Sequence, residues 1–375
     1  MGEFSIKTYF IHSLLFVLTF ITTTLAGAEW MFGKSFIFTP EPLGWDEFWQ
    51  GMYFSVPFLS VLTVHEFGHY ITARLYKIRL TLPYYIPFWL GIGSIGTMGA
   101  FIRIKSPLRT RQEYFDVGIA GPLAGFILAL GVLWYGFTHL PAPEHIFTIH
   151  PEYQQYGLEY AKYVYKDIEV SFSLGRNLLF VLFEKFVAND AARIPNVYEM
   201  AHYPFLFAGY LSLFFTSLNL LPIGQLDGGH ILFSMVGYRK HALIAPVLFV
   251  AFVFYAGLGL VVPPALETEF MDTLQWALLY LGFLFITFSR TAKGTKNAIL
   301  LSLSVFAGQY LFAFLWPDIT GYHGWLLFAF ILGRFLGVYH PPVLYDRPLS
   351  PGRQLLGWLS LVIFLLSFSP RPFVF

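Results

Sequence analysis

Three observations predict an all-α polytopic membrane protein with about nine transmembrane helices. Of the 375 residues, 56% are hydrophobic and only 12% are charged, whereas soluble proteins carry about 25% charged residues. Aromatic residues reach 20%, in line with the interfacial belts of membrane proteins. Long apolar runs recur along the whole chain, and about 20 apolar residues suffice for a helix to cross a bilayer.

Nine apolar runs are the candidate spans, although the eighth is short and the sixth and seventh lie close together. They cover residues 8–26, 48–72, 115–138, 203–222, 242–262, 273–289, 297–315, 323–338 and 354–369. The first run could instead belong to a signal peptide, because Lys7 precedes it and Ala26-Gly27-Ala28 ends it. Glu3 and the length of the run favour a span that is retained.

Charged loops orient this bundle, because basic loops stay on the cytoplasmic side. The basic residues fall on one side of nine spans and are Arg74, Lys77, Arg79, Arg103, Lys105, Arg109, Arg111, Arg239, Lys240, Arg290, Lys293, Lys296, Arg334, Arg347 and Arg353. The loops on the other side are acidic, with Glu29, Glu41, Asp46, Glu47, Glu267, Glu269 and Asp272. We expect an inside N-terminus and an outside C-terminus.

An H-E-x-x-H pattern lies inside the second apolar run. In a helix, His65 and His69 stand one turn apart on the same face and can bind one metal ion. Glu66 lies about 100° round the helix, where it can act on a water held by that metal. Ionisable residues are costly at membrane depth, so this trio is a candidate functional site.

A third metal ligand is expected, because catalytic zinc usually has three protein ligands and one open position. Asp227 is the candidate, since it follows the apolar run 203–222 and lies between a proline break and two glycines. Both runs cross from outside to inside in the predicted topology. The histidines and Asp227 should therefore meet at similar depth.

Composition excludes several other chemistries. The chain has no cysteine, which rules out disulfides, iron–sulfur clusters, a thiol nucleophile and thiolate-ligated zinc. The formal net charge is +1, and we find no basic stripe or recognition motif, so no nucleic-acid partner is expected.

Residues 82–106 are apolar but interrupted by Pro83, Pro87, Gly91, Gly93, Gly96 and Gly99. Pro and Gly at this density disfavour a straight helix, and irregular backbone at membrane depth is tolerated where it is buried or lines a cavity. We expect a small re-entrant β-hairpin near the active site, with an edge for an extended substrate. An ordinary interfacial loop is the alternative.

The pairing of HEFGH (residues 65–69) with NLLPIGQLDGG (residues 219–229) resembles the site-2 protease family of intramembrane zinc metalloproteases. Between them, Gly118-Ile-Ala-Gly121-Pro122 is similar to the glycine-proline motif of that family. The C-terminal HPPVLYDRPLSPGRQLLGW resembles the PDZ-less branch, found in cyanobacteria and chloroplasts.

This resemblance implies a role for each motif residue. His65, His69 and Asp227 would hold one Zn²⁺ per chain, and Glu66 would serve as general base and acid. Asn219 is similar to the family residue that helps position the substrate or its oxyanion. The resemblance also implies cleavage of a single-span membrane protein within the lipid bilayer, as in regulated intramembrane proteolysis. The site would face the cytoplasmic side, in a bacterial inner membrane.

We divide the chain into five segments. Residues 1–47 hold the first span and an external loop, and 242–375 hold the C-terminal spans. Residues 48–138 and 203–241 form the two parts of the catalytic core. Residues 139–202 form an external soluble insertion, which is too short for an appended PDZ module.

Alternatives exist for each signal. A metal-ion transporter or a catalytically silent membrane scaffold could carry the same motifs, although transporters tend to show repeated halves. Asp227 could be a turn residue and Asn219 a helix cap. We expect His230 to be structural and His12 to face a neighbouring helix. The histidines at predicted ends and loops should be interfacial or solvated, namely His145, His150, His202, His323 and His340.

Overall fold

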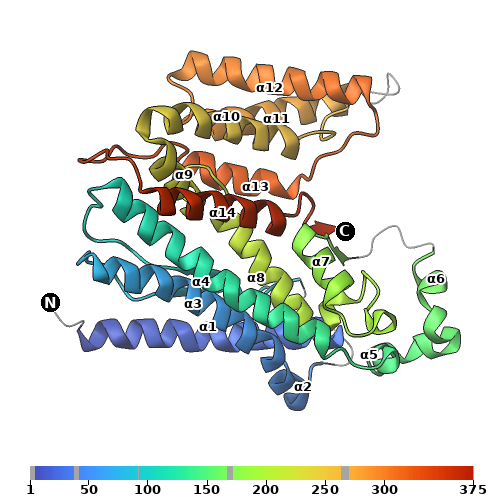
Figure 1. The fold of residues 1–375 in the computed structure, drawn as a ribbon. Helices are drawn as coiled ribbons and strands as arrows, with labels where there is room; N and C mark the ends of the chain where they lie inside the picture. Colours follow the sequence, from blue (N-terminus) through green and yellow to red (C-terminus); the bar gives the residue numbers. More distant parts are fainter. Residues whose placement is uncertain (1–4, 38–41, 92, 167–171, 263–269, 375) are drawn as a thin grey trace. The chain divides into compact units, whose positions relative to one another are not determined.

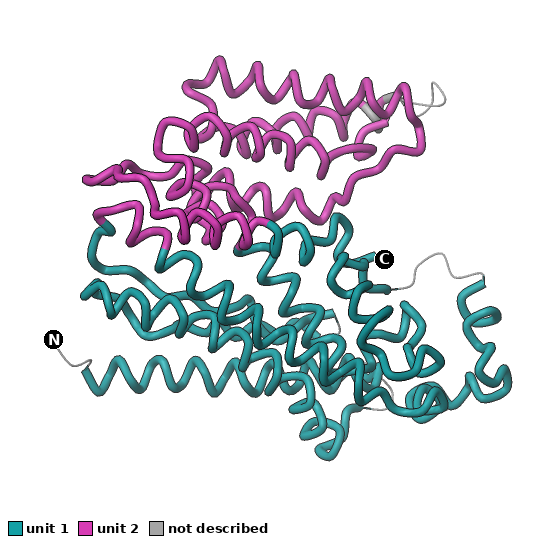
Figure 2. The backbone as a smooth tube through the Cα atoms, in the orientation of Figure 1, with its two compact units in different colours: residues 1–108, 116–219, 362–375 teal, residues 109–115, 220–361 magenta. Residues whose placement is uncertain are grey.

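The structure is a computed structural model that describes residues 5–37, 42–91, 93–166, 172–262 and 270–374, most of them helical (Figure 1). The chain forms two compact units (Figure 2). Unit 1 holds residues 1–108, 116–219 and 362–375, and unit 2 holds residues 109–115 and 220–361. The five segments expected from the sequence are a separate division and stay a prediction.

Four long helices build the frame of unit 1. They are α1 (Ile6–Phe32), α3 (Met52–Leu75), α4 (Arg111–Thr138, here from residue 116) and α8 (Pro204–Leu220, here to residue 219), with the short α2 (Trp45–Gln50) before α3. Aromatic side chains dominate their shared core, where Phe54, Phe207 and Tyr210 are almost completely buried. Burial of such large apolar side chains is the main favourable term in folding.

The predicted hairpin is confirmed at residues 84–101. Strands β1 (Tyr84–Pro87) and β2 (Thr97–Phe101) pair antiparallel, with Tyr84 opposite Phe101 and an irregularity after Tyr85. The hydroxyl of Thr22 on α1 donates to the carbonyl of Gly96 at 2.6 Å. The hydroxyls of Tyr85 and Thr63 lie 2.8 Å apart, which ties β1 to α3 two residues before His65.

The insertion folds as short helical turns that pack within unit 1. They are η1 (Pro143–His145), α5 (Ile146–Ile149), η2 (Pro151–Glu159), α6 (Ala161–Val164), α7 (Leu178–Phe186), η3 (Ala191–Arg193) and η4 (Met200–His202). Strand β3 (Ser173–Leu174) pairs with β4 (Phe373–Val374), so the C-terminal strand closes this unit. The Tyr210 hydroxyl lies 2.6 Å from the carbonyls of Gly175 and Pro372 and supports the same junction.

Unit 2 is built mainly of helices. It contains α9 (Asp227–Val236), α10 (Tyr238–Ala256), α11 (Phe270–Phe288), α12 (Thr295–Leu315), α13 (Gly324–Ile331) with a π-helical turn (Leu332–Leu336), and the first part of α14 (Pro351–Ser367). Arg111 is buried there and donates to the carbonyls of Ser234 and Met235 at 2.8 and 2.9 Å. These bonds satisfy carbonyls that the C-terminal end of α9 leaves unpaired.

Each of the nine predicted runs overlaps a helix, but the count of nine membrane spans stays a prediction. Among the described residues, four helices are long and apolar enough to cross a membrane by length and composition: α1, α4, α10 and α12.

One loop assignment was wrong, because Glu29 lies within α1 and is buried. Its carboxylate accepts from the Trp89 indole at 2.8 Å. Glu3, Glu41, Glu267 and Glu269 lie outside the described residues, as does the side chain of Asp272.

Candidate metal centre

Helix α3 carries His65, Glu66 and His69 on consecutive turns, and all three side chains are buried. The Nε2 atoms of His65 and His69 lie 3.0 Å apart, and their ring centroids are separated by 4.7 Å. The i, i+4 spacing of a helix produces this convergence. Two ring nitrogens therefore face one point, as the sequence predicted.

The tautomer of His69 is set by a neighbouring helix. Its Nδ1 lies 2.7 Å from the carbonyl oxygen of Val117 on α4. A carbonyl only accepts hydrogen bonds, so Nδ1 carries the proton and Nε2 presents a lone pair. A metal-ligating histidine commonly donates its other nitrogen to a carbonyl in this way. The residues present thus fit a zinc ion.

Two glycines let α3 and α4 approach closely enough for that bond. A Cβ placed on Gly121 would lie 2.2 Å from His69 Nε2, and one on Gly68 would lie 2.6 Å from the carbonyl oxygen of Ala120. Both distances are far below van der Waals contact. The glycine-proline motif therefore acts here by close helix packing, and the same packing positions the ligand.

Glu66 and Asn219 both lie next to His65. A Glu66 carboxylate oxygen is 4.0 Å from His65 Nε2, and the Asn219 amide, at the end of α8, is 3.4 Å from the same nitrogen. The two predicted catalytic side chains thus share the neighbourhood of one ring nitrogen. Their roles in a reaction stay predictions.

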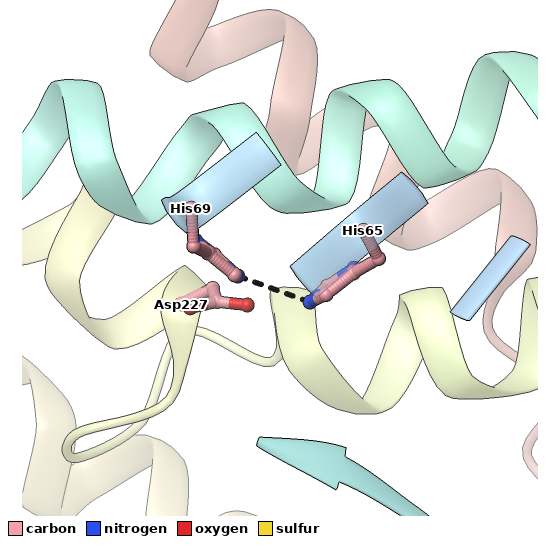
Figure 3. Close-up of side chains that lie close together, drawn as sticks. All are labelled: His65, His69 and Asp227. Carbon is pink, nitrogen blue, oxygen red and sulfur yellow. Dashed lines mark hydrogen bonds between the residues drawn. The ribbon is translucent and has the colours of Figure 1, made fainter. Parts of the chain in front are cut away.

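Asp227 is the first residue of α9, directly after the proline break that the sequence indicates. Together with His65 and His69, Asp227 belongs to a group of side chains that could hold a metal ion (Figure 3). Two imidazole nitrogens and a carboxylate oxygen form a donor set found in catalytic zinc sites.

Within unit 2, a second histidine pair supports the helix that begins with Asp227. His230 Nδ1 lies 2.9 Å from His340 Nε2, and His340 Nδ1 lies 2.7 Å from the carbonyl of Pro341. The His340 ring stacks on Phe233 at 3.7 Å and is only 2% exposed. The structural role expected for His230 agrees with this contact, but the expectation of a solvated His340 was wrong. The sequence offered one sign of an ordered segment here, because His340 is followed by two prolines, which restrict the backbone to few conformations.

We expected His12 to face a neighbouring helix, but its ring contacts Pro83 and Tyr84, which are not helical. Its Nδ1 lies 2.8 Å from the carbonyl oxygen of Pro83, just before β1. The solvated alternative is wrong for His202 as well, since its side chain is only 12% exposed. His202 belongs to a second cluster of ligand-type side chains, with His150 and Glu199.

Comparison with known proteins agrees with these observations. The family model described as Peptidase family M50 matches residues 53–263. The chain is 31% identical over 196 residues to "Probable zinc metalloprotease EGY2, chloroplastic" of Oryza sativa subsp. indica, which is 52% of this chain and 31% of that protein. It is 28% identical over 187 residues to "Probable zinc metalloprotease EGY1, chloroplastic" of Arabidopsis thaliana, which is 50% of this chain and 29% of that protein.

The aligned regions thus cover about a third of the length of these curated relatives. No solved structure gives a significant match. The family match covers more than half of the chain and contains all three motifs. The chain therefore belongs to peptidase family M50.

Proposed function

We propose that this protein hydrolyses peptide bonds within or next to a transmembrane segment of single-span, membrane-anchored proteins. One observation carries the proposal. Two histidine nitrogens lie 3.0 Å apart beside a buried glutamate, in the interior of an otherwise apolar helix. Such groups are costly at membrane depth and mark functional sites there.

His65, His69 and Asp227 are the ligands in this proposal, and they hold one zinc ion at the reaction centre. When bound, zinc polarises the scissile carbonyl and lowers the pKa of a coordinated water toward about 7. Glu66 takes the proton of the attacking water and delivers it to the leaving amine. The Asn219 amide donates a hydrogen bond to the oxygen on which negative charge develops.

Substrate is expected to bind as an extended strand, because a helix hides its carbonyl groups. The β1–β2 hairpin is the platform in this proposal. Met98 and Phe101 of β2 are 60% and 48% exposed, so β2 has apolar side chains available to a partner. A strand added to a sheet edge gains main-chain hydrogen bonds, and pockets for its side chains give selectivity.

The approach to this platform is an open apolar groove between α1 and α3. It is lined by Phe16, Phe20, Val56, Leu59, Ser60, Thr63 and Val64. Thr63 bonds to Tyr85 of β1 and is two residues from His65. A transmembrane segment that entered here would pass the hairpin before it reached the metal ligands.

Sidedness is proposed from loop charge alone. The basic loops place the H-E-x-x-H end of α3 toward the cytoplasmic side, or the side equivalent to it. The relatives are named as chloroplastic, so they give no support to the bacterial inner membrane expected from the sequence. Regulated intramembrane proteolysis, in which the cut releases a signalling domain, is the physiological role that we infer.

The test uses the purified full chain in liposomes with a single-span model substrate. We expect Glu66→Gln to abolish cleavage while its zinc content stays at the wild-type value, because the ligands remain. Glu144→Gln, which changes an exposed glutamate of η1, should cleave like wild type.

Two results would exclude proteolysis. A wild-type protein that cuts no membrane-anchored substrate but moves zinc across the vesicle membrane would be a transporter. A scaffold would neither cut a substrate nor move zinc. Cells that carry Glu66→Gln would then show every membrane protein at its normal length.

A further inference from the structure

A second group of ligand-type side chains lies in unit 1, within the insertion and at its junction with α8. His150 follows α5, Glu199 precedes η4 and His202 ends η4. His202 Nε2 lies 3.3 Å from Glu199 Oε2 and 3.3 Å from His150 Nε2, and His150 Nε2 lies 3.9 Å from Glu199 Oε2. Three donor atoms from segments about 50 residues apart thus face one point.

The other polar atom of each of these three side chains already has a hydrogen-bond partner. His202 Nδ1 lies 3.0 Å from the carbonyl of Met31, in the last turn of α1. His150 Nδ1 lies 3.1 Å from a carboxylate oxygen of Glu152, and Glu199 Oε1 accepts from the Tyr165 hydroxyl. Carbonyl and carboxylate partners behind histidine ligands are typical of metal sites, where they fix the tautomer and the ring orientation.

These partners determine which atoms carry lone pairs. The Met31 carbonyl can only accept, so His202 Nδ1 donates and its Nε2 is unprotonated when the ring is neutral. The Glu152 carboxylate selects the same tautomer for His150. Two ring lone pairs and a carboxylate oxygen then converge, an arrangement that a cation between them would stabilise.

Burial supports the same conclusion. The Glu199 side chain is only 1% exposed, and His202 and His150 are 12% and 25% exposed. Buried charges are normally paired or bound to a metal.

We propose that His150, Glu199 and His202 form a second zinc site, separate from the catalytic centre. The point equidistant from the three donor atoms lies about 2 Å from each, which is the usual Zn–N and Zn–O distance. A water molecule would supply a fourth ligand. The site is structural, because its ligands and the Met31 carbonyl behind His202 clamp the insertion to the end of α1.

This inference does not depend on the proposed proteolysis, and metal counting tests it. Purified full-length chain is loaded with zinc, freed of loosely bound ions and measured by mass spectrometry. We expect two zinc ions per chain in wild type, one in His202→Ala, one in His69→Ala and none in the double variant. His139→Ala is the matched control, since His139 is exposed and belongs to the same unit, and it should keep two.

A wild-type chain with one zinc that His202→Ala retains would overturn the proposal and leave a hydrogen-bonded cluster without metal. His150→Ala guards against misfolding, because His150 is the most exposed of the three ligands. In the His69→Ala background, Co²⁺ should give the visible absorption of a tetrahedral site, and His150→Ala should remove it. Retention of those bands by the double variant would equally refute the site.

Discussion

At the scale of single residues, the candidate metal centre depends on positions that have no side chain. His65 and His69 can converge because of helical spacing, but Val117 can fix the ring of His69 only because Gly68 and Gly121 allow close contact. The glycines therefore act as positioning residues for a metal ligand. Their contribution differs from that of Glu66 and Asn219, which lie beside the proposed reaction centre.

Gly121→Ala should damage the centre through this packing. The added Cβ would lie 2.2 Å from His69 Nε2, so the ring or the helix must move. We expect at least a tenfold loss of cleavage and weaker zinc retention at the catalytic site, measured by activity and by metal content after dialysis against a chelator.

The matched control is Gly131→Ala on the same helix, where no atom within 4 Å would meet the new Cβ. It should keep full activity and gain about 0.5–1 kcal/mol of stability, because alanine is a better helix former than glycine. Equal behaviour of the two variants would contradict the packing argument.

At the scale of elements, the hairpin is the feature that the sequence predicted least directly and that the structure defines well. Its strands are short, and a two-stranded hairpin alone is marginally stable in water. Hydrogen bonds to α1 and α3 supply the missing support. The platform is thus held next to the metal-binding helix by side chains of its neighbours.

Tyr85→Phe tests that support. Loss of the bond between Tyr85 and Thr63 should cost about 1 kcal/mol and lower the thermal midpoint of the protein in detergent. If β1 holds the substrate platform in register, the cleavage rate should also fall at temperatures where the variant is still fully folded. Tyr84→Phe is the control, because Tyr84 packs through its ring on His12 and Phe101.

The cycle that combines Tyr85→Phe with Thr63→Val completes this test. If the loss of stability comes from the bond between the two hydroxyls, the double variant should be no less stable than the less stable of the two single variants. Additive losses would mean that the two hydroxyls act independently.

At the scale of the whole molecule, the membrane topology is predicted from apolar runs and loop charge. Nine apolar runs overlap helices, yet only α1, α4, α10 and α12 meet the length and composition of a membrane span among the described residues. Shorter apolar helices can still cross a thin or locally distorted bilayer. Loop charge therefore stays the argument for sidedness.

The absence of cysteine makes this topology easy to measure. Gln154→Cys in the insertion and Lys240→Cys at the start of α10 both replace exposed residues. In sealed, oriented vesicles, a membrane-impermeant maleimide should label one variant from the outside and the other only after permeabilisation. Labelling of both from the same side would refute the predicted orientation.

Local sequence patterns are sufficient to predict several parts of this protein. An i, i+4 histidine pair in an apolar run, a Pro- and Gly-rich break and an Asp-Gly-Gly turn indicate chemistry and backbone shape because spacing and burial cost act over a few residues. These patterns predicted the zinc peptidase family, the hairpin and the ligand candidates before any contact was known.

Contacts between residues far apart in the sequence become visible only in the folded chain. The convergence of His150 with Glu199 and His202, the burial of Glu29 in α1 and the stacking of His340 on Phe233 all join segments far apart in sequence or alter their solvation. Hydropathy patterns do not encode such pairings, since they depend on how the packed elements exclude water. The proposed second zinc site depends on that packing, whereas the candidate first site is already indicated by a five-residue motif.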